Sequence, residues 1–518
     1  MIRAFATVGL WTMLSRILGF VRDIMIAAFL GAGPVAEAFV IAFALPNMFR
    51  RFFAEGAFNM AFVPLFSKKL EAGDDAEGFA RDALTGLALL LIIFTTLALF
   101  AMPWLVFAMA SGFAGDARFE LATLYGRIAF PYILFISLAA LASGVLNAAG
   151  YFVAAAAAPV LLNLLFVSAL LLGDAAGWDP GLTLSWAVSL AGIAQLALVW
   201  TAAKRAGFRL TPRWPRMTPE LKRLAIIAAP AALAGGVVQV NLLVGRQVAS
   251  YFEGAAAWLY YADRLYQLPL GVVGIAIGIV LLPDLSRRLQ ARDSDGGQQA
   301  FSRAGEMSLA LTLPAAVALI VIPLPLVSVL FERGAFSAAD AAPTALATAV
   351  YGAGLPAFVL QKVLQPLYFA REDTRTPFRY ALVAMGLNAT IAIGLAPFVG
   401  YIAAALGATL AGWAMTWLLW RGTRGMGQDA TLDARFWRRL PRIAVASALM
   451  GAVLAAGSFA LSDLLTQDGV RYAALAALIA LGVTSYAVAA HLAGAFRLTD
   501  LKRHLRRSAA TQKGDETR

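Results

Sequence analysis

Long apolar segments recur along the whole 518-residue chain, and they restrict its fold more than any other feature of the sequence. About 20 predominantly apolar residues are needed for a helix to cross the hydrocarbon core, whereas strands of a membrane barrel are about ten alternating residues long. Charged residues make up only 14% of the chain, and roughly 25% is typical of soluble domains. The sequence therefore predicts an all-α integral membrane protein and excludes a string of soluble domains.

Fourteen of these segments are predicted to be transmembrane helices. Arg16 interrupts the first apolar segment, so this segment is interpreted as a helix and not as a cleaved signal peptide. The expected ranges are 4–30, 34–66, 82–110, 119–148, 153–173, 183–204, 222–251, 255–284, 303–331, 341–370, 376–397, 400–421, 440–462 and 471–496.

Positive charge is distributed unevenly among the predicted loops. Most of the 42 lysines and arginines follow even-numbered helices, whereas the loops after odd-numbered helices contain only Arg118, Arg333 and Arg471. Because cytoplasmic loops carry the excess of lysine and arginine, both termini are predicted to be cytoplasmic. The net charge of +12 is thus a topology signal, and it does not indicate a nucleic-acid partner.

A weak internal repeat relates the two halves of the chain. Leu45-Pro46 followed by Val63–Lys68 is matched about 220 residues later by Leu268-Pro269 followed by Leu282–Arg287. The offset equals six helices, which keeps both copies in the same orientation. We therefore predict two pseudo-symmetric six-helix lobes, with the substrate between them, as in many transporters. The lobes are residues 1–215 and 216–430, followed by two additional C-terminal helices within 431–497 and a basic cytoplasmic tail, 498–518.

Ionisable residues inside the predicted helices require an explanation, because a charge near the bilayer centre costs about 2.5–3.5 kcal/mol. The acids are Asp23, Glu37, Glu55 and Asp263. The cations, all interpreted as buried, are Arg16, Arg22, Arg50, Arg51, Arg127, Arg246, Arg264 and Lys362.

Pairing between neighbours accounts for part of this charge. Arg22 adjoins Asp23, and Glu37 falls near one helical face with Arg51 and Glu55. The acids are too few to neutralise all of the cations, so we expect a cationic, water-filled cavity. Such a cavity suits an anionic substrate, and guanidinium groups match phosphate oxygens.

Other sequence features narrow the chemistry. The chain has no cysteine and only two histidines, and no GxxxxGK[ST] pattern is present. We therefore expect no metal cluster, no self-contained ATP hydrolysis and no enzymatic activity. Asn163 and Asn388 occupy roughly matching repeat positions, where either could bind an ion or form an interhelical hydrogen bond.

Several motifs resemble those of one transporter family. The segment Ser15–Asp23 is similar to the first-helix signature of the MurJ/MviN lipid II flippases, which belong to the multidrug/oligosaccharidyl-lipid/polysaccharide exporter superfamily. The resemblance covers essentially the whole chain. Further matching segments are Leu45–Arg51, Phe53–Phe58, Ala61–Pro64, Tyr260–Leu265 and Asp373–Pro377.

This resemblance implies a function. Members of the family move lipid II, the undecaprenyl-diphosphate-linked peptidoglycan precursor, from the inner to the outer leaflet of the bacterial cytoplasmic membrane. We expect alternating access, driven by the membrane potential or a coupling cation, with no bound cofactor. The two C-terminal helices are similar to those that form a lipid-tail groove in the family. Expected partners are lipid II, membrane lipids and the machinery for peptidoglycan synthesis and division, and the expected state is a monomer.

The resemblance also implies a set of substrate-binding residues. Arginines that match Arg16, Arg22, Arg50 and Arg264 line the family's central cavity. Some members bind sodium through carboxylates between helices 7 and 11, where this chain has Asn241 and Asn388 instead. Charged residues in the same motifs complete the expected site: Arg51, Glu37, Glu55 and Asp263.

Three other functions stay open at the level of sequence. A flippase for another polyprenyl-diphosphate glycan would have similar cavity chemistry. An ion-coupled drug antiporter would need an acidic cavity, the opposite of the charge seen here. A non-transporting scaffold for cell-wall enzymes would depend on its loops and not on the intramembrane arginines.

Overall fold

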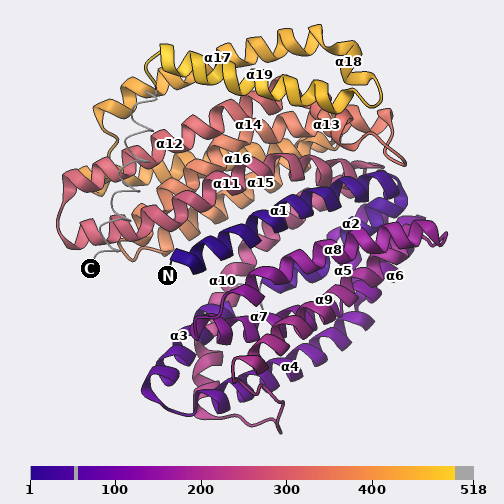
Figure 1. Cartoon of the computed structure of the whole chain (residues 1–518), viewed down its shortest axis with the longest axis vertical. Coiled ribbons are helices and arrows are strands. Elements are labelled where there is room, and N and C mark those ends of the chain that lie inside the picture. The colour runs from indigo at the N-terminus through magenta and orange to yellow at the C-terminus, as the bar shows by residue number, and fades with distance from the viewer. Residues whose placement is uncertain (1, 52–56, 496–518) are drawn as a thin grey trace. The chain divides into compact units, whose positions relative to one another are not determined.

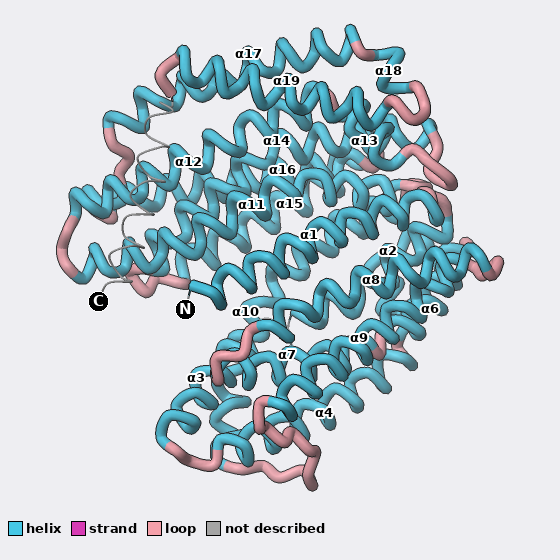
Figure 2. Tube along the Cα trace, in the orientation of Figure 1, coloured by secondary structure: helices cyan, strands magenta, loops and turns pink. Residues whose placement is uncertain are grey.

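Helices account for nearly all of the described chain. The computed structural model describes residues 2–51 and 57–495 (Figures 1 and 2). Within these ranges no strand is formed, and the one β-type contact is an isolated bridge between Arg333 and Phe336. The predicted all-α fold class is confirmed.

The described residues fall into two compact units. Unit 1 takes its residues from Met1–Tyr261, Phe331–Asp340 and Ala392–Ala404, and unit 2 from the remaining segments. The helices α11 (Ala255–Gln290), α14 (Ala338–Phe369), α15 (Arg375–Val399) and α16 (Ile402–Gly422) contribute to both units. The lobes and domain boundaries expected from the internal repeat stay a prediction.

Unit 1 is built mainly from the first ten helices. Within it, α8 packs against both α1 and α9, α9 also packs against α7, and α2 packs against α6 (Figure 1). These helices are α1 (Ile2–Leu30), α2 (Pro34–Arg50), α3 (Ala57–Ala72), α4 (Ala76–Phe100), α5 (Met102–Met109), α6 (Ala117–Ala129), α7 (Tyr132–Ala148), α8 (Val153–Ala175), α9 (Pro180–Arg205) and α10 (Pro219–Ser250).

Unit 2 contains most of the second half of the chain. At its C-terminal end α17 packs between α12 and α19, and α17 and α19 run side by side in Figure 1. Leu454, Leu475 and Leu478 lie in the apolar core of this region. The remaining helices are α12 (Ser294–Val321), α13 (Pro323–Phe331, assigned partly to unit 1), α17 (Ala434–Ala460), α18 (Ser462–Thr466) and α19 (Arg471–Leu492).

Aspartates at N-caps determine where several helices begin. Asp75, Asp116, Asp179, Asp293 and Asp433 each accept a hydrogen bond from a backbone N–H in the first turn of the helix that follows. Such caps satisfy donors that lack a partner inside the helix. The expected starts at 82, 303 and 440 were therefore too late, because helix ends are polar and extend beyond the apolar segment.

Three of the expected continuous helices are interrupted in the described chain; the range 34–66 holds α2 and α3 but also includes residues outside that part of the chain. The range 82–110 is divided at Ala101. Pro131 is the N-cap of α7 and divides 119–148, while Pro323 begins α13 and divides 303–331. Proline lacks the N–H that would continue a helix, so apolarity alone could not distinguish one helix from two.

Ten helical segments in the described chain are long and apolar enough to cross a membrane. The expected ranges without a counterpart among them are 4–30, 34–66, 222–251 and 255–284. These four ranges contain most of the ionisable residues that the sequence places inside membrane helices. The chain is thus a multi-pass helical protein, and the full number of crossings stays a prediction.

Two glycines allow a loop to dock on the end of α1. Gly31 and Gly334 have φ values of +64° and +57°. A Cβ at Gly31 would overlap the carbonyl oxygen of Ala335, and one at Gly334 would overlap that of Ala28. The Ala335 N–H donates to the Ala28 carbonyl oxygen at 2.7 Å. Only glycine combines this conformation with so close an approach.

Candidate functional site

Arg22 is held in place by two neighbouring side chains. Its Nη2 donates to Oδ1 of Asp23 at 2.7 Å, and its Nη1 donates to Oδ1 of Asn163 at 2.9 Å. The guanidinium also lies over the ring of Phe166, 5.6 Å from the ring centroid. With only 11% of its side chain exposed, Arg22 is fixed between α1 and α8. Such a group is oriented before any ligand arrives.

Asn163 and Tyr260 extend this network. The Nδ2 of Asn163 donates to the carbonyl oxygen of Ser15 at 2.9 Å, and the hydroxyl of Tyr260 donates to Oδ1 of Asp23 at 3.1 Å. Asn163 therefore forms the interhelical hydrogen bonds that were one of its two expected roles. Tyr260 belongs to a matched motif, but sequence reasoning did not identify it as a partner of Asp23.

Glu37 has a different partner from the one expected. It is fully buried, and its Oε2 accepts a hydrogen bond from Nη1 of Arg118 at 3.0 Å. Its Oε1 accepts from the backbone N–H of Ala256 at 3.1 Å. The expected pairing of Glu37 with Arg51 is wrong, because Arg118 folds inward from the start of α6. In this structure Glu37 joins α2 and α6 to the first turn of α11.

Arg118 was expected to be a loop residue outside the membrane, yet it is among the buried residues. Its Nη2 donates to Oδ2 of Asp116 at 2.6 Å, and its guanidinium lies 4.4 Å from the ring centroid of Phe113. The hydrogen bond from Arg118 holds the pKa of the Asp116 carboxyl below its ordinary value of 3.8. One signal was available in the sequence: Arg118 is one of only three cations in the loops after odd-numbered predicted helices.

The other expected site residues of unit 1 lie on α1 and at the end of α2. Arg16 and Arg50 are half-buried, and Arg51 is exposed and follows the last residue of α2. Arg16 precedes Asp23 by seven residues, so both lie near one face of α1. Glu55 lies outside the described residues.

Asp263 and Arg264 belong to unit 2. Both are half-buried on α11, and Nε2 of Gln267 donates to Oδ2 of Asp263. One turn on, the ring of Tyr266 stacks on that of Tyr351 with 5.3 Å between centroids. This part of α11 therefore presents one carboxylate and one guanidinium group close to a pair of stacked tyrosine rings.

Three cations expected to be buried are exposed in the structure: Arg51, Arg127 and Lys362. Arg127 donates from Nε to the carbonyl oxygen of Leu99 at 3.3 Å. The amphipathic stems of arginine and lysine can place the charge at a surface, which helical position alone does not reveal. The surplus of buried positive charge is smaller than the sequence suggested. Among the described residues, no group of His, Cys, Asp or Glu side chains could hold a metal ion.

Comparison with known proteins assigns the chain to a family. The family model for the lipid II flippase MurJ matches residues 26–470. A probable lipid II flippase MurJ of Rhizobium tropici is 43% identical over 99% of this chain and 98% of its own length. The chain belongs to the MurJ family. The lipid II flippase MurJ of Burkholderia cenocepacia is 36% identical over 82% of this chain and 84% of its own length.

Solved structures agree with this assignment at the level of the fold. A lipid II flippase MurJ in an inward closed conformation has a TM-score of 0.79 at 24% identity and covers 94% of this chain and 98% of its own. An inward-facing multidrug resistance transporter of the MATE family and MOP superfamily has a TM-score of 0.68 at 15% identity, over 83% of this chain and 100% of its own. The MurJ fold of this chain is thus shared with a wider group of transporters.

Proposed function

We propose that this protein translocates lipid II from the inner to the outer leaflet of the cytoplasmic membrane by alternating access. The observation that carries the proposal is the 43% identity to a probable lipid II flippase over 99% of the chain. Transporters with a related fold, described in inward-facing and outward-facing conformations, support a cycle of this kind. The protein acts as a transporter and not as an enzyme.

The diphosphate of lipid II is bound by arginines in this proposal. Arg22 is the best supported of them, because Asp23 and Asn163 already orient its guanidinium. Arg16 and Arg50 add half-buried positive charge in unit 1, and Arg264 adds it in unit 2. A hydrogen bond to a charged group contributes about 1.5–3 kcal/mol, so loss of one guanidinium should weaken diphosphate binding roughly 10- to 150-fold.

Acidic residues have supporting roles. Asp23 keeps Arg22 in place, and Glu37 ties α2 to Arg118. Because Glu37 is fully buried, we assign it to positioning and not to direct contact with substrate. Arg51 and Asp263 are proposed to act at the edge of the substrate path.

The membrane potential is the proposed energy source, with a coupling cation as the alternative. Moving roughly two negative charges outward gains about 5 kcal/mol at 100 mV, inside negative, because each charge contributes about 2.3 kcal/mol. The further proposals are fourteen membrane crossings in two lobes plus two C-terminal helices, cytoplasmic termini, and a polyprenyl tail held along α17 and α19. The protein is proposed to work as a monomer in the inner membrane, beside the enzymes of peptidoglycan synthesis.

Reconstitution of the purified protein tests the proposed substrate. Labelled lipid II would be placed in the vesicles with wild-type protein, and its exposure on each leaflet measured with an impermeant reagent. A second polyprenyl-diphosphate lipid with a different glycan would be measured in parallel. We expect the protein to raise the rate at which lipid II changes leaflet, well above that in protein-free vesicles.

Two results would contradict the proposal. Equal rates in the presence and absence of protein would exclude translocation. Faster movement of the other glycan lipid would favour the rival function of a flippase for another polyprenyl-diphosphate substrate.

A further inference from the structure

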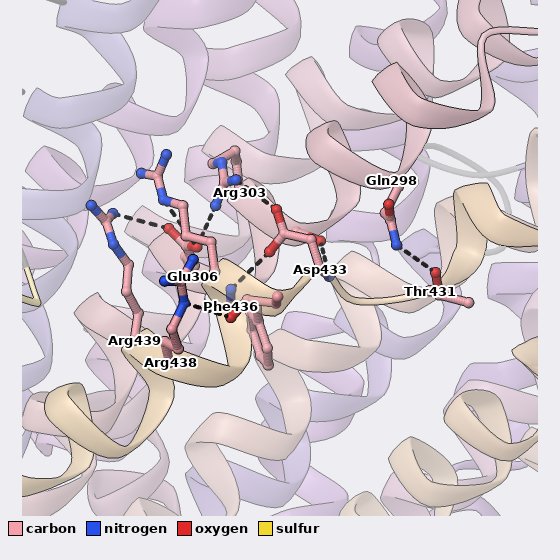
Figure 3. Close-up of polar contacts among 11 residues, drawn as sticks. Gln298, Arg303, Glu306, Thr431, Asp433, Phe436, Arg438 and Arg439 are labelled. Atoms are coloured by element: carbon pink, nitrogen blue, oxygen red, sulfur yellow. Dashed lines mark hydrogen bonds and ion pairs between the residues drawn. The ribbon is translucent and has the colours of Figure 1, made fainter.

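A group of arginines lies where α12 meets the first turns of α17. We call Arg303, Arg435, Arg438 and Arg439 the α12–α17 arginine patch. Figure 3 labels three of them: Arg303, Arg438 and Arg439. Three of the four converge on one carboxylate, that of Glu306. Its Oε2 accepts from Nη1 of Arg439 at 3.1 Å, its Oε1 lies 3.5 Å from Nε of Arg435, and Arg303 also hydrogen-bonds to Oε1.

The two acidic residues in this group, Glu306 and Asp433, already form ion pairs or hydrogen bonds within the protein. Glu306 is 4% exposed and lies beneath the arginines. Asp433 pairs with Nη2 of Arg303 at 2.6 Å and also caps α17 through the backbone N–H of Phe436 at 2.7 Å. Among the described residues, two carboxylates therefore face four guanidinium groups, which gives the patch an excess of positive charge within that part of the chain.

The excess charge is accessible. The side chains of Arg303 and Arg435 are 35% and 43% exposed, and Arg438 is also exposed. Arg438 uses its Nε to hydrogen-bond the carbonyl oxygen of Ala434 on its own helix, at 3.3 Å. Guanidinium groups that are anchored on one side and open on the other suit a phosphate group, which accepts several hydrogen bonds at once.

The sequence pattern predicts that the patch lies at the depth of the lipid head groups. The predicted membrane segments of α12 and α17 begin at 303 and 440, next to these arginines. Trp437, which is 51% exposed, lies in the same turn as Arg438. Tryptophan beside arginine at the end of an apolar helix is typical of the interface between membrane and water. The positive-inside pattern predicts that this end of both helices is cytoplasmic.

An exposed apolar stripe continues from the patch along α17. Val445 and Leu449 follow Arg438 by seven and eleven residues, so the three lie near one face of the helix. Both side chains are 54% exposed. A ligand with a phosphate head and an acyl chain could thus contact the patch and the stripe together, whereas a soluble phosphate would use the patch alone.

We propose that the α12–α17 arginine patch binds the phosphate head group of an anionic phospholipid in the cytoplasmic leaflet, with an acyl chain along Val445 and Leu449. The proposal holds whichever lipid the protein translocates. An anionic surface attracts each nearby arginine by about 1 kcal/mol, which is about a fivefold change in affinity.

Lipid binding to the purified full-length protein tests the proposal. Native mass spectrometry would measure the affinity for phosphatidylglycerol and phosphatidylcholine in wild type and in an Arg435→Gln/Arg438→Gln variant, which keeps Arg303 and Arg439 on Glu306. We expect wild type to prefer phosphatidylglycerol and the variant to bind it about 25-fold more weakly. The matched control is Arg216→Gln/Arg223→Gln, which removes the same charge from two exposed residues of unit 1.

Further comparisons make the outcome decisive. An Arg435→Lys/Arg438→Lys variant keeps the charge but not the planar guanidinium donors, so its affinity should lie between that of the glutamine variant and that of wild type. Thermal unfolding identifies a variant that fails to fold. A loss of affinity in the control variant, or in the folded lysine variant, as large as that in the glutamine variant would overturn the proposal. Displacement of the lipid by inorganic pyrophosphate at the same affinity would assign the patch to a soluble phosphate and overturn it as well.

Discussion

The buried pair of Glu37 and Arg118 allows a prediction in which the effect of Glu37→Gln on the free energy of unfolding changes sign between two backgrounds. Removing one partner of a buried ion pair costs about 3–5 kcal/mol, because the other charge is left uncompensated. Arg118→Met should therefore lower the free energy of unfolding by about that amount. Glu37→Gln should cost only about 1–2 kcal/mol, since Arg118 still binds Asp116 and the glutamine oxygen can still accept from the Ala256 N–H.

The double variant provides the test. In the Arg118→Met background, Glu37→Gln removes the uncompensated charge and should raise the free energy of unfolding by about 1–3 kcal/mol. Unfolding in mixed micelles with increasing dodecyl sulfate, followed by circular dichroism, would measure all four proteins at pH 7. If Glu37→Gln lowers the free energy of unfolding of the Arg118→Met protein by as much as it lowers that of wild type, the two side chains are not coupled and the reasoning fails.

Three smaller predictions concern a turn, a loop and a titrating carboxyl. Gly334→Ala should lower the midpoint of thermal unfolding, because its Cβ would overlap the carbonyl oxygen of Ala28; an unchanged midpoint would contradict this. Arg213 binds the carbonyl oxygen of Gly78 on α4 at 2.8 Å, so Arg213→Met should speed cleavage of the 206–218 loop by chymotrypsin. Because the pKa of Asp116 is lowered in the folded protein, its ionised carboxyl stabilises the fold at pH values above the ordinary pKa of 3.8. The difference in the free energy of unfolding between wild type and Asp116→Asn should therefore be constant from pH 5 to 7 and shrink below pH 3.8.

Apolarity and charge predicted the all-α fold and the approximate position of the helices, because those properties are local. They did not predict where helices begin, since the capping aspartates lie outside the apolar segments, as Asp293 and Asp433 do. Nor did they reveal the breaks at Pro131 and Pro323. Helix ends and breaks depend on hydrogen bonds of individual residues and not on mean hydropathy.

The candidate site was predictable where partners are close in sequence. Arg22 and Asp23 are neighbours, and their pairing is confirmed. The partners of Glu37 could not be read from helical spacing, because Arg118 and Ala256 come from distant segments that only the fold brings to α2. Burial was also mispredicted for Arg127, whose exposure depends on which way its helix faces.

The central claim is that Arg22, oriented by Asp23 and Asn163, binds the diphosphate of lipid II during translocation. The most direct measurement compares lipid II translocation by wild type, Arg22→Gln and Arg127→Gln in vesicles held at the same inside-negative potential. Arg127 is the matched control, since it is also an arginine of a membrane helix but is exposed. We predict that Arg22→Gln loses at least about tenfold in rate, while Arg127→Gln stays near wild type. Equal rates for wild type and a folded Arg22→Gln protein would contradict the account.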